Sequence, residues 1–195
     1  QPVLDGISPE RLAAITESPR HYGFHATLKP PFRLADRHSA EVLHNAVEMF
    51  AALRSPFTIP DLEIAVLDRF VGVRPSRPCA ALQTLADDCV RTFDEFRAPP
   101  STEESAKRRA AGLTQAQEKL LDRWGYAYVF EEFRPHFSLT ERIEESAECD
   151  KTLQAIRTIW PPESLANITV ESVSIFSQLD TGRPFYQTAR FQFGG

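Results

Sequence analysis

The sequence has few cysteines, no long apolar run and no excess of basic residues. Its three cysteines are Cys79, Cys89 and Cys149. They are odd in number and lack the spacing of metal ligands, which excludes a disulfide-rich scaffold and a cysteine-based metal site. We therefore expect reduced thiols and a cytoplasmic protein. No apolar run approaches the ~18 residues of a transmembrane helix, and the mean hydropathy is −0.31, so we expect no membrane partner.

The charge balance excludes another class of partner. The chain has 22 Lys and Arg against 27 Asp and Glu, which gives a net charge of −5. A protein that follows a long nucleic acid needs a basic surface to displace counterions, so no long nucleic acid is expected as a partner. A small phosphorylated substrate needs only a local cationic pocket. Several glutamates between 131 and 148 would also repel an extended polyanion.

The sequence does contain one short pattern twice, as His25-Ala26-Thr27-Leu28 and His136-Phe137-Ser138-Leu139. Because side chains alternate along a strand, the histidine and the hydroxyl residue of each copy share one face. The same alternation predicts that Lys29, Arg134 and Thr140 also lie on the cleft face. Two such strands would direct two imidazoles and two hydroxyls towards one anion.

This combination suits phosphodiester chemistry. One of His25 and His136 can remove a proton from water while the other donates a proton to the leaving oxygen. Thr27 and Ser138 would bind the remaining oxygens, and the predicted substrate contacts are Lys29, Arg134, Tyr22 and Thr140. The residues require no metal and no cofactor, and a metal site built from the histidines and nearby carboxylates has no spacing signature.

Structural roles explain some of the same residues. A histidine on a half-buried strand is more often a hydrogen-bonded structural residue than a catalyst. Threonine is common in strands for packing reasons alone. The matched offset of the two copies favours the functional interpretation.

Cap and periodicity signals predict the elements around the motifs. A short helix follows Ser8-Pro9-Glu10, and a longer one spans 39–53 behind a Ser39 cap. Further helices are expected at 79–97, at 113–124 with Thr114 and Gln117 as a capping pair, and at 151–160. Strands are expected at 24–29, 61–68, 70–74, 136–142, 168–176 and 185–193, and the turn 180–184 joins the last pair.

These elements predict an α+β protein that forms a single domain over 1–195. The second half repeats the order of the first, so we expect two pseudo-symmetric lobes whose antiparallel sheets form a central cleft, with helices on the outer faces. The stretch 98–112 is either the divider between the lobes or a flap.

The paired His-x-Thr/Ser motifs resemble the 2H phosphoesterase superfamily, which includes 2',3'-cyclic phosphodiesterases and RNA 2',5'-ligase-like proteins. The stretches 22–32 and 133–140 more narrowly resemble a bacterial branch of unknown substrate, DUF1045, that is described as associated with phosphonate metabolism. The resemblance implies metal-independent hydrolysis of a cyclic phosphodiester, of the 2',3'-cyclic nucleotide or ribosyl cyclic phosphate type. It also implies a strand upstream of Ser8. Since the sequence opens at Gln1 without Met, we expect that strand to be missing and a sheet edge beside the first motif to be unpaired.

Two other functions remain open at this stage. The same cleft could belong to a module that binds a nucleotide or phosphorylated metabolite without turnover. An RNA end-processing or ligase-like protein would instead bind RNA with a steep salt dependence. We expect a monomer, although the sequence does not fix the oligomeric state.

Overall fold

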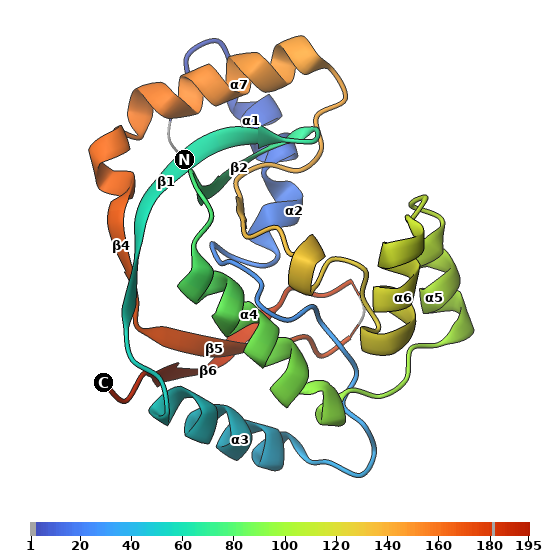
Figure 1. The fold of residues 1–195 in the computed structure, drawn as a ribbon. Coiled ribbons are helices and arrows are strands. Elements are labelled where there is room, and N and C mark those ends of the chain that lie inside the picture. The colour runs from blue at the N-terminus through green and yellow to red at the C-terminus, as the bar shows by residue number, and fades with distance from the viewer. Residues whose placement is uncertain (1–2, 181) are drawn as a thin grey trace.

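A computed structural model describes residues 3–180 and 182–195 and confirms an α+β protein (Figure 1). The helices are α1 (Pro9–Ile15), α2 (Glu17–Arg20), α3 (Ala40–Ala52), α4 (Ala80–Thr92), α5 (Thr102–Arg109), α6 (Gln115–Trp124) and α7 (Ser146–Ile159). The strands are β1 (Phe57–Leu67), β2 (Phe70–Pro75), β3 (Phe137–Ser138), β4 (Ala166–Val170), β5 (Ser172–Ser177) and β6 (Tyr186–Gln192). Short 3-10 turns lie at η1 (Asp94–Phe96), η2 (Phe130–Glu132) and η3 (Pro162–Leu165).

Strand β1 is the longest strand and links most of the fold. It pairs with β2 through its second half, as the predicted hairpin, and with β4 through its first half. The resulting antiparallel sheet has the order β3-β2-β1-β4, while β5 and β6 form a separate antiparallel pair. Figure 1 shows β1 curving along one side of the molecule, with α7 above the hairpin and α3 beside the β5–β6 pair.

Local capping signals predicted most helix starts correctly. Ser8 and Ser39 accept hydrogen bonds from the first turns of α1 and α3. Thr114 and Gln117 form the predicted reciprocal capping box of α6. Helix α5 was not predicted, although Ser101 opens it with a capping box of its own. None of its residues is buried, so it has no apolar stripe for periodicity to detect.

The two motif strands are much shorter than predicted. The only pairing of the first motif in the described chain is an isolated bridge between Ala26 and Phe137, and the second motif is limited to β3. The β2–β3 pairing ends after Ser138 because the N–H groups of Leu139 and Thr140 both donate to the carbonyl of Val71. In a regular ladder each carbonyl accepts from one N–H group of the neighbouring strand. The carbonyl of Val71 accepts from two, so the chain turns out of the sheet.

The prediction of one strand over 168–176 was also wrong. The chain changes sheets at Glu171, because β4 pairs with β1 whereas β5 pairs with β6. The carbonyl of Glu171 itself accepts from the N–H of Phe193. The predicted turn at 180–184 includes Thr181, which lies outside the described residues. Gly182 has the positive φ, 86°, that was expected there, and the N–H of Arg183 donates to the carbonyl of Asp180.

The buried residues form two clusters. One packs α1 and α7 against the β1–β2 hairpin, and the other packs α3 and α4 against the β5–β6 pair. The pseudo-symmetry of two lobes remains a prediction. No helix in the described part of the chain is long and apolar enough to cross a membrane.

Candidate functional site

The bridge between Ala26 and Phe137 brings the two motifs side by side. It is antiparallel, so its register places Thr27 opposite His136 and His25 opposite Ser138. Residues opposite one another in such a pair point to the same face, with Cβ atoms about 5 Å apart. Extended by one residue on each side of the bridge, this register puts the two histidines on one diagonal of a four-residue cluster and the two hydroxyl residues on the other.

Both histidines are held by the same backbone contact. The Nδ1 atom of His25 lies 3.0 Å from the carbonyl oxygen of Gly23, and Nδ1 of His136 lies 2.7 Å from that of Arg134. A carbonyl oxygen only accepts hydrogen bonds, so each Nδ1 carries the proton and donates it. In the neutral ring, the lone pair then belongs to Nε2, which is the atom available for proton transfer. Gly23 adopts φ 69°, a conformation that most residues avoid.

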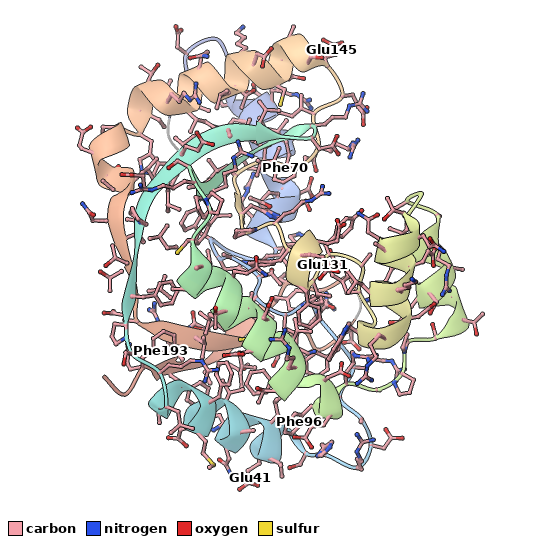
Figure 2. All side chains as sticks on the ribbon, in the orientation of Figure 1. Glu41, Phe70, Phe96, Glu131, Glu145 and Phe193 are labelled. Carbon is pink, nitrogen blue, oxygen red and sulfur yellow. The ribbon has the colours of Figure 1, made fainter. Side chains whose placement is uncertain are left out.

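The surroundings of the two rings are also similar. The ring of His25 lies 5.1 Å from that of Phe176, and the ring of His136 lies 5.4 Å from that of Phe70, between centroids. Phe70 is labelled in Figure 2 beside the β1–β2 hairpin. Both imidazoles are half-buried. An aromatic neighbour limits the rotation of each ring.

The hydroxyl residues complete the cluster in different ways. Thr27 is exposed, and its Oγ1 lies 3.2 Å from Nε2 of His25. Ser138 is half-buried and pairs with Gly72 of β2. A Cβ at Gly72 would lie 2.9 Å from the carbonyl oxygen of Phe137, so only glycine allows β2 and β3 to approach this closely. Sequence reasoning missed Gly72, although a glycine inside a strand signals such an approach.

The side chain of Lys29 is buried and bonded to other groups of the protein. Its Nζ donates to the carbonyl of Val90 at 3.2 Å and lies 3.7 Å from Asp94. Only 8% of the side chain is exposed, and this burial lowers the pKa of Lys29 to about 8 despite the opposing effect of Asp94. The ammonium group of Lys29 is therefore already bonded to groups of the protein itself.

Arg134 and Tyr22 are two further residues that were predicted to contact the substrate. Arg134 is exposed, lies 5.3 Å above the ring of Tyr128 and is 3.7 Å from Glu132. Tyr22 stacks on Phe185 with centroids 5.2 Å apart, and its ring lies 6.2 Å from that of His25. Tyr22 therefore borders the first motif, whereas Arg134 contributes its backbone carbonyl to His136.

The prediction that Thr140 faces the cleft was wrong. Its side chain is 2% exposed. The hydroxyl accepts from the N–H of Val71 at 2.9 Å and donates to the carbonyl of Glu141 at 2.9 Å. Alternation fails at Thr140 because the strand has already ended, and its hydroxyl serves the buried backbone instead.

A cavity of about 740 Å³ opens beside the first motif. Residues 24–29 border one side and 168–176 border another, and the second motif contributes Pro135 and Phe137. Arg190 of β6 also borders this cavity, and the sequence analysis did not single it out. No three His, Cys, Asp or Glu side chains within 3–180 and 182–195 come together as metal ligands; metal independence remains a prediction.

Comparisons with known proteins connect this geometry to a family. The family described as "Protein of unknown function (DUF1045)" matches residues 27–186. The chain is 33% identical over 195 residues to ribose 1,5-bisphosphate phosphokinase PhnN of Janthinobacterium sp. (strain Marseille), covering 98% of this chain and 43% of that protein. It is 34% identical over 124 residues to PhnN of Laribacter hongkongensis (strain HLHK9), covering 64% of this chain and 28% of that protein. The chain thus spans less than half the length of these curated relatives.

Proposed function

This chain belongs to the DUF1045 family, and we propose that it is a phosphodiesterase of the 2H type that hydrolyses a small cyclic phosphodiester in phosphonate metabolism. The observation that carries the proposal is the matched pair of histidines. Each donates from Nδ1 to the carbonyl two residues upstream, and the bridge between Ala26 and Phe137 supports their lying on one face.

The proposed reaction uses Nε2 of both rings. One of His25 and His136 takes a proton from water, which attacks the phosphorus, while the other, protonated, donates a proton to the leaving ribose-type oxygen. An imidazole ring accepts a proton at Nε2 when neutral and donates one when protonated, so the same side chain suits both roles. Thr27 and Ser138 donate to the non-bridging oxygens, and Arg134 adds positive charge as negative charge develops. No step requires a metal ion or cofactor.

The names of the relatives suggest a different activity. Both are called ribose 1,5-bisphosphate phosphokinases. The present sequence has no Gly-x-x-x-x-Gly-Lys-Ser/Thr stretch, the loop that cradles phosphates in many phosphoryl-transfer enzymes. Its own residues therefore favour hydrolysis over phosphorylation, and what we carry over from the relatives is a ribosyl phosphate context.

The deciding experiment is turnover in EDTA across three substrate types. These are 2',3'-cyclic nucleotides, ribosyl cyclic phosphates and 2',5'-linked oligonucleotides, each tested with wild type and with the His25→Ala/His136→Ala double variant. Hydrolysis that survives EDTA and disappears in the double variant supports the proposal. The matched control is His38→Ala, because His38 lies outside both motifs and packs on Phe96. Equal turnover by wild type and double variant contradicts the proposed function. Tight binding without turnover indicates a non-catalytic binding module.

A further inference from the structure

Arg190 lies on the same face of the β5–β6 pair as an aromatic residue of the site. In the register, Arg190 is opposite Ser174. Val173 and Ile175 pack into the second buried cluster, so alternation directs Ser174 and Phe176 to the opposite face. Arg190 shares that face because paired residues point the same way.

That face adjoins the first motif. The ring of Phe176 lies 5.1 Å from that of His25, and Ser174 is two residues away, about 7 Å along an extended strand. His25, Thr27, Ser174 and Arg190 all border the same cavity. A ligand that reaches from His25 to Arg190 therefore needs a spacer of about the size of a sugar ring.

The charge of Arg190 is available to a ligand. Its Nε donates to Oγ of Ser172 at 2.9 Å, which orients the guanidinium but does not neutralise it. The other two cations considered for the site each have a carboxylate partner, since Lys29 is 3.7 Å from Asp94 and Arg134 is 3.7 Å from Glu132. Among the described side chains, no carboxylate oxygen lies within 4.0 Å of Arg190. A guanidinium in this state beside a cavity attracts phosphate or carboxylate groups, which it can bind with two parallel hydrogen bonds.

We propose that Arg190 and Ser174 form a second anion subsite, so that the substrate is a sugar cyclic phosphodiester that carries a further phosphate group. This inference rests on the proposed function for the cyclic phosphodiester half of the substrate. The histidine cluster takes the ester that reacts, and Arg190 takes the phosphate that does not. Binding energy at the second group orients the first and improves discrimination between sugar phosphates.

The first test compares two substrates that differ by one group, a ribose cyclic phosphodiester with and without a phosphate on the 5-hydroxyl. Wild type should prefer the doubly anionic substrate in kcat/KM. Arg190→Gln should reduce that preference at least about tenfold, mainly through KM. The matched control is Arg77→Gln, because Arg77 is exposed and lies 3.7 Å from Asp61. No preference in wild type, or an equal loss on both substrates in Arg190→Gln, overturns the subsite.

A second test does not depend on turnover. Calorimetric titration with ribose 5-phosphate reports on the subsite alone, because this ligand has no cyclic ester. Wild type and His25→Ala should bind it alike, whereas Arg190→Gln should bind at least about tenfold more weakly. If Arg190→Gln binds as wild type does, the subsite is wrong even when hydrolysis is confirmed. If hydrolysis fails on every substrate but this binding pattern holds, the proposed reaction is wrong and the subsite stands.

Discussion

Ala26 pairs with Phe137 across a single antiparallel bridge, and neither side chain takes part in the proposed chemistry. Phe137 also pairs with Val73 of β2, and its ring stacks on Phe24 with centroids 4.9 Å apart. The residue between the histidine and the hydroxyl residue of each motif thus aligns the two motifs, while its neighbours are the residues that the proposed reaction uses. This division explains why apolar residues alternate with the polar ones.

Each single histidine substitution should abolish most of the activity without unfolding the protein. His25→Ala and His136→Ala should each lower kcat at least about a hundredfold, the usual contribution of a positioned acid or base. Because the two act in one step, the double variant should lose much less than the product of the two single effects. Steady-state kinetics measures the losses in the single and double variants, and thermal melting checks their folding. A normally folded single variant with full turnover would contradict the mechanism.

The hydroxyl residues should act through substrate affinity. Thr27→Val and Ser138→Ala each remove a donor to a non-bridging oxygen, so KM should rise by about threefold to tenfold, in line with a net hydrogen bond of about 1 kcal/mol. Steady-state kinetics on the active substrate measures this. Unchanged KM and kcat in both variants would remove these residues from the site.

Thr140→Val provides the structural counterpart to Thr27→Val. It leaves the buried N–H of Val71 without its hydroxyl acceptor, which should lower the free energy of unfolding by about 1–3 kcal/mol. Urea denaturation measures the change. A larger loss of stability in Thr27→Val than in Thr140→Val would reverse the assigned roles, since Thr27 is exposed.

Gly72→Ala should damage both stability and activity. The added Cβ would meet the carbonyl of Phe137 at 2.9 Å, so β3 must shift, at a cost of about 1–3 kcal/mol for overpacking, and His136 shifts with it. Gly112→Ala is the control for activity: no neighbouring atom lies within 4 Å of a Cβ there, but its φ of 74° strains an alanine, so this variant should lose stability without losing activity. Melting and turnover are compared for both, and equal activity losses in the two variants would argue against this role for Gly72.

Lys29 should give the stability curve a distinct pH dependence. Burial lowers the pKa of Lys29 to about 8 from its ordinary value of 10.5, so between these values the unfolded chain binds more protons than the folded protein. Its contribution to the free energy of unfolding therefore rises with pH across that window. Relative to Lys29→Met, wild type should gain stability from pH 7 to pH 10 in denaturation experiments. A pH-independent difference would show that the ammonium is not buried as described.

Local signals in the sequence predicted the parts of the fold that depend on neighbouring residues. The caps at Ser39 and Thr114 fixed helix starts because capping uses donors and acceptors within one turn. The β1–β2 hairpin followed from alternation around a short turn. Helix α5 was not predicted, because its eight residues present no buried face.

The limits of the motif strands depended on distant residues. Alternation failed for Thr140, where the carbonyl of Val71 accepts two N–H groups. The burial of Lys29 requires the carbonyl of Val90 on α4. Neither partner is near its residue in sequence, so no local pattern could reveal the contact.

The sequence by itself determined that two histidine–hydroxyl pairs exist and that each pair shares one side of its chain, because alternation in an extended backbone is local. Only the tertiary structure decided that Ala26 pairs with Phe137, which brings Thr27 and His136 opposite one another, and that Arg190 borders the same cavity as His25. The two motifs lie more than a hundred residues apart in the sequence. Pairing between such distant segments is fixed only when the whole chain packs.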